Sequence, residues 1–233
     1  MFEQRAAGPE LMDGPHFGLQ DVVDTFRFIE PVNRWLGGKG TILSFFQRES
    51  RAWDRAQSYR LLDVGCGSGD IPLALALWGR RNDYRLQIEA IDRHPLTVEL
   101  ARRRCQGYPE IVLACRDIFE PDGQKYDYVL ASMFLHHFPD ESIPGVLRSL
   151  LAVCSRKVVI NDLLRDPLAY SGTWLFTLLT SAVSRHDARL SVKKGFTLRE
   201  MDRLLRDNAF HGFRLESHFF YRFLLIVDKE ASS

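Results

Sequence analysis

The chain has 233 residues, with 31 Lys and Arg, 30 Asp and Glu, and a formal net charge of +1 at pH 7. This length suits one large domain with a sizeable core, or one domain with an appendage. The balanced charge gives no general attraction to nucleic acid or to an anionic membrane, so we expect no nucleic-acid partner.

Cysteine usage and the first residues indicate the compartment. None of the four cysteines forms a C-x-x-C pair, and "MFEQRAAGPE" lacks the apolar core of a secretory signal. These features predict a reduced, cytoplasmic protein. The longest apolar stretch, residues 171–183, is shorter than the roughly 20 residues that span a bilayer, although it could contact a greasy ligand or a membrane surface. A monomer and a homodimer both remain open.

The N-terminal quarter differs from the rest of the chain. Residues 1–18 are rich in Gly and Pro, and we expect them to be loosely held. Apolar residues at helical spacing predict two or three helices over about 19–57. One of them, "IEPVNRWLGG", has Pro31 near its first turn and is stopped by Gly37 and Gly38. We interpret residues 1–57 as a helical cap.

From residue 60, short apolar runs alternate with helical segments. Strands are predicted at 59–65, 85–92, 111–117, 126–133 and 156–163, and helices at 70–79, 95–105 and 140–153. This alternation indicates an α/β fold with a parallel sheet and helices on both faces.

The end of the chain adds a different pattern. Residues 197–209 form an amphipathic helix capped by Thr197 with Glu200 three residues on, and residues 213–229 read as an antiparallel hairpin. Residues 163–195 are too long for a simple connection. Because this insertion follows the carboxyl end of a strand, where open α/β sheets bind ligands, we expect a lid formed with the N-terminal helices. The main domain is then 58–233.

The stretch "LLDVGCGSGD", residues 61–70, places three glycines between a strand and a helix. Glycine there lets the chain turn tightly and lets a ligand approach the backbone. Dinucleotide binding requires G-x-G-x-x-G, but Asp70 occupies the final position, which disfavours an NAD-dependent oxidoreductase. Carboxylates at Asp63 and Asp70 would repel a pyrophosphate and attract the ammonium group of an amino acid.

Acidic residues end the next two predicted strands. Asp92 lies 23 residues past Gly69, where a carboxylate accepts hydrogen bonds from both ribose hydroxyls. Asp117 and Ile118 offer an acceptor for an adenine amino group and a flat apolar contact for its ring. Acceptors for an ammonium group, a ribose and an adenine, in this order, predict that the ligand is S-adenosylmethionine.

The motifs "LLDVGCGSGD", "AIDRHP", "CRDIF" and "YDYVLASMFLHHF" resemble those of class I S-adenosylmethionine-dependent methyltransferases, over about residues 58–162. The "LHHF" element is similar to that of ubiquinone and menaquinone C-methyltransferases and of many small-molecule O-methyltransferases. The resemblance implies a Rossmann-like, seven-stranded, mostly parallel sheet whose last strand is antiparallel, with S-adenosylhomocysteine as product.

The resemblance also implies roles for matching positions. It places the methionine part of the cofactor at Asp63, Gly65, Cys66 and Gly67, and the ribose at Asp92 and Arg93. It places the adenine at Asp117 and Ile118, and the methyl group near Ser132 and Met133.

Other motifs limit the methyl acceptor. "ASMF" after the fourth strand replaces the N/D-P-P-Y/F element of many exocyclic-amine methyltransferases, and no Pro-Cys element for cytosine C5 chemistry follows. A metal-dependent catechol enzyme would require acids after both the fourth and fifth strands, but only Asp162 is present, so we expect no metal. Direct transfer then requires alignment and a base.

Three histidines are candidates for that base. His136 and His137 open the helix after the fourth strand, where we expect one to face the pocket and the other to pack or cap. His186 lies in the insertion, and the following Asp187 could fix its ring. Side chains expected to contact the acceptor are Asp162, Arg165, Trp174 and Trp35.

Aromatic and aliphatic side chains of the insertion and of the N-terminal helices predict a hydrophobic, ring-bearing acceptor. A phenol, a quinol or a polyketide-like aromatic fits, as in secondary metabolism, and O-methylation is favoured. C-methylation of a quinone precursor, methylation of RNA or protein, and a non-catalytic scaffold remain alternatives.

Overall fold

The computed structural model describes residues 2–11, 37–120, 123–178 and 180–229. The predicted helix around Pro31 and the predicted acceptor contact Trp35 lie outside these residues.

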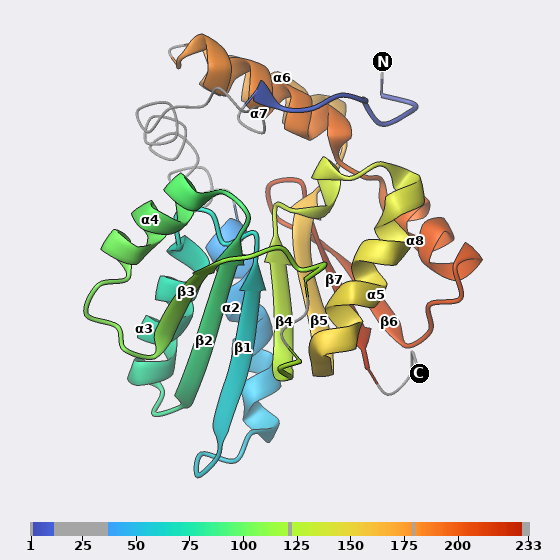
Figure 1. Ribbon diagram of the computed structural model, residues 1–233. Helices are drawn as coiled ribbons and strands as arrows, with labels where there is room; N and C mark the ends of the chain where they lie inside the picture. The colour runs from blue at the N-terminus through green and yellow to red at the C-terminus, as the bar shows by residue number, and fades with distance from the viewer. Residues whose placement is uncertain (1, 12–36, 121–122, 179, 230–233) are drawn as a thin grey trace.

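A seven-stranded sheet forms the centre of the molecule (Figure 1), in the order β3-β2-β1-β4-β5-β7-β6. β7 is antiparallel to both of its neighbours, β5 and β6, and the other pairs are parallel. The predicted sheet and hairpin are therefore confirmed. The strands are β1 (Ser58–Val64), β2 (Arg85–Asp92), β3 (Ile111–Cys115), β4 (Tyr126–Ser132), β5 (Cys154–Leu163), β6 (Phe213–His218) and β7 (Arg222–Asp228).

Side chains alternate along each strand, so each face of the sheet builds its own core. Leu61 packs into a cluster with residues of α2 and α3, whereas its neighbour Leu62 packs into a cluster with residues of α5 and α8. Both leucines are fully buried. The covering helices are α2 (Gly38–Glu49), α3 (Asp70–Arg81), α4 (Pro95–Arg104), α5 (Ile143–Val153) and α8 (Leu198–Asp207).

The strand order reverses between β1 and β4, since β2 and β3 lie on one side of β1 and the later strands lie on the other. In open α/β sheets, ligands bind beside such a reversal, at the carboxyl ends of the strands. The fold thus places the site where β1, β2 and β4 end.

Gly37 takes a φ of +87° and α2 begins at Gly38, next to the carbonyl of Phe219 in the β6–β7 turn. The predicted helix boundary after β4 was wrong. His136 and His137 lie in a 3₁₀ turn, Leu135–His137, and a second turn, Asp140–Ser142, precedes α5. Pro139 lies between these turns and Pro144 lies in the first turn of α5, so the helix starts late.

The insertion forms two helices, α6 (Pro167–Phe176) and α7 (Ala182–Lys194), above the carboxyl ends of the strands (Figure 1). Residues 2–11 run alongside them, and the Ala6 amide donates to the Lys193 carbonyl over 3.0 Å. The prediction of a loosely held opening is wrong for these residues. Arg5 anchors them: its guanidinium donates to the carbonyls of Lys194, His136 and Phe138 and lies 3.8 Å from the centre of the Phe196 ring.

No helix in the described part of the chain has both the length and the apolar character needed to cross a bilayer.

Candidate functional site

A cavity of about 570 Å³ opens at the carboxyl ends of β1, β2 and β4. Glu10 from the N-terminal segment and Ser191 from α7 line its upper side. Every residue that the sequence assigned to the cofactor lines this one cavity: Asp63, Gly65, Cys66, Gly67, Asp92, Arg93, Asp117, Ile118, Ser132 and Met133.

The glycine loop between β1 and α3 takes a backbone path that side chains disfavour. Gly65, Gly67 and Gly69 have φ values of +67°, +52° and +75°. A Cβ atom on Gly65 would lie 2.7 Å from Cδ2 of Phe134, a distance that forces the ring to move. The glycines therefore allow both the turn and the close packing of Phe134 against the loop.

Asp63, near the end of β1, carries a carboxylate that is buried and incompletely hydrogen-bonded. Its side chain is 1% exposed, and its Oδ2 atom has no hydrogen-bond partner among the described residues. Burial raises the pKa of Asp63 well above its usual range, and the negative charges of Asp70 and Asp92 raise it further. A buried acceptor without a partner is costly, so this atom favours a cationic ligand group in the cavity.

Asp70 differs from Asp63, although the sequence treats both as possible partners of an ammonium group. Its Oδ2 atom lies 3.5 Å from the Lys39 Nζ atom of α2. Because Asp70 has this cation within the protein, Asp63 is the better acceptor for a ligand.

Asp92 fixes the end of β2 to the glycine loop. Its Oδ2 accepts a hydrogen bond from the Gly67 amide over 3.1 Å, and its Oδ1 accepts from the His94 amide over 2.9 Å. Burial raises its pKa, against the lowering effect of these two amides. The carboxylate is held in one orientation at the cavity wall, with lone pairs left for a ligand.

The third strand end supplies an apolar surface with one acceptor. Ile118 is 5% exposed, and the ring of Phe119 meets that of Phe138 edge to face, with centroids 6.4 Å apart. Asp117 accepts the Phe119 amide through Oδ1 over 3.1 Å. A flat aromatic ring fits between such groups.

The end of β4 carries backbone strain. Met133 has a φ of +56°, which a residue with a side chain rarely adopts. Its amide donates to the Asn161 carbonyl over 2.9 Å, and Asn161 Nδ2 donates to Ser132 Oγ over 3.0 Å. These bonds to β5 hold Ser132 and Met133 at the cavity.

His136 is engaged at both ring nitrogens. The ring is 1% exposed, its Nδ1 lies 2.6 Å from Asp162 Oδ1, and its Nε2 lies 3.6 Å from Glu10 Oε1. His136 lines the cavity, but both of its ring nitrogens are directed at carboxylates of the protein.

Asp162 lies behind His136 and is 0% exposed. It does not line the cavity, although the sequence analysis predicted that it contacts the acceptor. Burial would raise its pKa, but the charge and hydrogen bond of His136, the Leu163 amide and the nearby Arg222 hold it at about 2. The guanidinium of Arg222 is itself buried, which lowers its pKa to about 10. The carboxylate orients His136 and does not bind a ligand.

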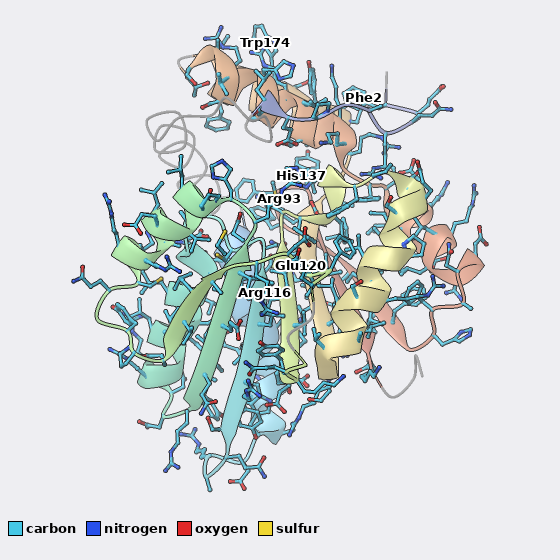
Figure 2. All side chains as sticks on the ribbon, viewed as in Figure 1. Phe2, Arg93, Arg116, Glu120, His137 and Trp174 are labelled. Carbon is cyan, nitrogen blue, oxygen red and sulfur yellow. The ribbon has the colours of Figure 1, made fainter. Side chains whose placement is uncertain are left out.

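His137 lines the cavity beside His136, with the two ring centroids 4.3 Å apart. Figure 2 shows it at the upper edge of the sheet, and Arg93 lines the same cavity. His186 is different: on α7 its side chain is 53% exposed, its Nδ1 contacts Asp187 Oδ1 over 3.0 Å, and it does not line the cavity. The predicted contact between His186 and Asp187 is present, but the predicted position of His186 at the pocket is wrong.

Two predicted acceptor contacts also lie elsewhere. Arg165 is 5% exposed and is ion-paired with Glu200 of α8, while its guanidinium donates to the carbonyls of Phe2 and Gly195. It anchors the N-terminal segment. Trp174 is 48% exposed and lies on α6, far from the sheet (Figure 2).

Glu10 is one of the cavity residues that sequence reasoning missed, together with Phe134, Phe138 and Ser191. It is 4% exposed, accepts a hydrogen bond from Ser191 Oγ over 2.9 Å, and has Lys194 Nζ at 3.5 Å. Its carboxylate and donor atoms of His136 and His137 all lie within 4.8 Å of one another, so the group could hold a metal ion. The lysine already compensates the charge of Glu10, and the absence of a metal stays a prediction. No periodic pattern surrounds Glu10 in the sequence, so only its acidity could have marked it.

Comparisons with known proteins agree with this geometry. Residues 61–157 match a family model described as a methyltransferase domain. The chain is 31% identical over 121 residues to methyltransferase calH of Penicillium decumbens, which covers 48% of this chain and 32% of that protein. It is 26% identical over 171 residues to 6-hydroxytryprostatin B O-methyltransferase of Aspergillus fumigatus, covering 70% and 46%. The chain thus spans less than half the length of these relatives.

Solved structures share the fold. The plantazolicin methyltransferase BamL, crystallised with S-adenosylhomocysteine, has a TM-score of 0.67 and 16% identity, and the match covers 90% of this chain and 91% of that one. The magnesium protoporphyrin IX methyltransferase of Synechocystis PCC 6803, with S-adenosylmethionine bound, has a TM-score of 0.56 and 16% identity over 92% and 99%. At this identity the similarity establishes the fold alone, and the predicted fold class is confirmed.

Proposed function

We propose that this chain, whose residues 61–157 match the model of a methyltransferase domain, transfers the methyl group of S-adenosylmethionine to an oxygen of a hydrophobic aromatic small molecule. The observation that carries the proposal is the buried Asp63 carboxylate, which faces the cavity with one oxygen unpartnered among the described residues. It stands in line with Asp92 and Asp117 from the next two strands along the sheet.

The donor set fits the cofactor group by group. Asp63 would accept from the ammonium group of the methionine part, and this contact removes the cost of a buried, unpaired oxygen. The fixed carboxylate of Asp92 would accept from the two ribose hydroxyls. Ile118 and Phe119 would contact the adenine ring, with Asp117 accepting from its amino group. When bound, S-adenosylmethionine supplies an electrophilic methyl group.

The residues of the protein would then orient the acceptor and remove its proton. Both histidines line the cavity, and His137 is the proposed base because the ring of His136 is held between Asp162 and Glu10. A phenol has a pKa of about 10, so loss of its proton at neutral pH benefits from a histidine base. Phe134 and Phe138 line the same cavity, with ring centroids 5.0 Å apart, and would exclude water from the acceptor ring.

Oxygen is proposed over carbon on two grounds. A base beside the cavity suits a hydroxyl acceptor, and one relative is named as an O-methyltransferase. The two solved neighbours are named as methyltransferases of plantazolicin and of magnesium protoporphyrin IX, which supports a small-molecule acceptor.

The proposed domain organisation is a core of residues 58–233 with a lid formed by residues 163–195 and the N-terminal region. Its support is the position of Glu10 and Ser191 at the cavity, joined by a hydrogen bond, above the sheet. In this proposal the lid limits the access of water to the acceptor.

The test is transfer of an isotopically labelled methyl group from S-adenosylmethionine to a lysate of the source cells, separated into organic-soluble, nucleic-acid and protein fractions. We expect label in the organic fraction, bound to oxygen. His137→Gln should abolish most of the label, while the matched variant His186→Gln, which changes an exposed histidine, should retain it. Label in RNA or protein would contradict the acceptor, and equal activity of the two variants would contradict the base.

A further inference from the structure

The helix α6 has a composition that its surroundings do not explain. Its ten residues, PLAYSGTWLF, include no charged side chain, and none of them is buried in the structure as described. A helix that is apolar on all sides normally lies in a protein core or in lipid. Five large apolar side chains of α6 and of the turn after it have exposed fractions of 41–69%, and we call them the apolar patch: Leu168, Trp174, Leu175, Phe176 and Leu178.

Cations border this apolar patch. The guanidinium of Arg189 lies 5.3 Å from the centre of the Trp174 ring, and Lys193 Nζ lies 4.8 Å from the centre of the Tyr170 ring. Arg185 donates to the carbonyls of Thr177, Leu178 and Thr180 at the end of α6, so the patch and the cations form one fixed unit.

Carboxylates are few in the described helices α6 and α7. The sequence from Asp166 to Lys194 contains two carboxylates. Asp166 caps the first turn of α6, and Asp187 is 4% exposed, so neither offsets the half-buried cations Arg189 and Lys193 of α7.

We propose that α6 lies in the surface of an anionic lipid bilayer. Its length, about 15 Å at 1.5 Å per residue, is half of what a hydrocarbon core requires, so it would lie in the interface and not cross it. Aromatic and aliphatic side chains would enter the boundary of the acyl chains, while Arg189 and Lys193 would reach the phosphate groups. The unit stands at the edge of the molecule, beyond the carboxyl ends of the strands, so no part of the sheet obstructs such contact (Figure 1).

The cations beside the patch favour an anionic bilayer over a second copy of the chain as its partner. A second copy of the chain would bring cations against cations if α6 met α6, whereas anionic headgroups complement them. The proposal concerns a surface outside the cavity and does not depend on the methyl-transfer reaction.

The experiment is flotation of the full chain with vesicles of phosphatidylglycerol and phosphatidylcholine, compared with phosphatidylcholine alone. We expect binding to the anionic vesicles that weakens as salt is added. The double variant Leu175→Ser/Phe176→Ser should weaken binding at least about tenfold. The single variant Lys193→Gln should weaken it about fivefold. The matched control Val112→Ser removes an apolar side chain that is 60% exposed on β3, and should bind as the wild type does.

Three results would overturn the proposal. One is a wild-type chain that does not float with anionic vesicles. Another is a double variant that changes from dimer to monomer in size-exclusion chromatography, which would assign the patch to a second copy. The third is a double variant that melts several degrees lower, which would mean that the chain itself covers the patch. Binding of S-adenosylhomocysteine, measured separately on each variant, distinguishes a failure of this proposal from a failure of the proposed cofactor site.

Discussion

His136 and Asp162 form a buried pair in which Nδ1 of the histidine lies 2.6 Å from Oδ1 of the carboxylate, with exposed fractions of 1% and 0%. The same carboxylate accepts the amides of Phe134, His136 and Leu163 over 3.1, 3.2 and 2.7 Å. One side chain of β5 therefore holds the whole turn that follows β4, and with it His137. The position of the proposed base depends on a residue that does not line the cavity.

Loss of this carboxylate should destabilise the fold. Asp162→Ala leaves three amides and an imidazole without their acceptor, and breaking a buried pair costs about 3–5 kcal/mol. The free energy of unfolding in guanidinium chloride measures the change. The control Asp202→Ala removes an exposed partner of Arg206 on α8 and should cost about 0.5 kcal/mol or less. Equal effects of the two substitutions would contradict the role given to Asp162.

The same residue predicts the dependence of stability on acid. The pKa of Asp162 is about 2 in the folded protein, below the value of about 3.9 in an unfolded chain. Its contribution is therefore present above pH 4 and is lost as the pH falls from about 4 to 2, a loss of about 2–3 kcal/mol. Wild type should lose more stability than Asp162→Asn over this range, in urea titrations at each pH. Parallel curves for the two proteins would rule out this linkage.

Substitution of Asp63 should raise the stability of the ligand-free protein and weaken its binding of S-adenosylhomocysteine. Because burial raises the pKa of Asp63, the ionised carboxylate costs stability as the pH rises, and Asp63→Asn removes that cost. We expect the ligand-free variant to melt higher at pH 8, by roughly 2–4 °C for each kcal/mol recovered, and S-adenosylhomocysteine to stabilise it no further. Thermal unfolding with and without this ligand measures both. Asp70→Asn, beside Lys39 in the same cavity, should retain more of the ligand effect.

Alanine substitutions at two glycines separate the cost of backbone strain from the cost of a steric clash in the glycine loop. Gly65→Ala adds a Cβ atom 2.7 Å from Phe134, whereas Gly107→Ala adds one with nothing within 4 Å, and both residues have positive φ. The control should lose about 1–2 kcal/mol from backbone strain alone. Gly65→Ala should lose more and should also bind S-adenosylhomocysteine more weakly, as calorimetry would record. A Gly65→Ala protein with unchanged affinity would mean that the loop does not contact the ligand.

Much of the sheet and one wall of the site were predictable because they rest on local patterns. Short apolar runs such as the one around Leu61 predict buried strands of a parallel sheet, and an acid at the end of such a run must reach the carboxyl edge of the sheet. Asp63, Asp92 and Asp117 accordingly reach the same cavity. The capping box of Thr197 and Glu200 is present as predicted.

The opposite wall was not predictable, because it depends on contacts between segments far apart in the chain. Glu10 meets Ser191, and Arg165 meets Phe2, across more than 160 residues. No periodicity records such pairs. The roles predicted for Arg165, His186 and Trp174 rested on their position in the insertion, and packing turned each away from the cavity.

The central claim is that this cavity binds S-adenosylmethionine through the acids at the strand ends. Calorimetric titration of S-adenosylhomocysteine into wild type, Asp92→Ala and the control Glu99→Ala, an exposed residue of α4, tests it most directly. Loss of two hydrogen bonds to a charged acceptor should weaken binding by Asp92→Ala about a hundredfold and leave the control unchanged. An affinity of Asp92→Ala equal to that of the wild type, in a protein with an unchanged circular dichroism spectrum, would contradict the cofactor site.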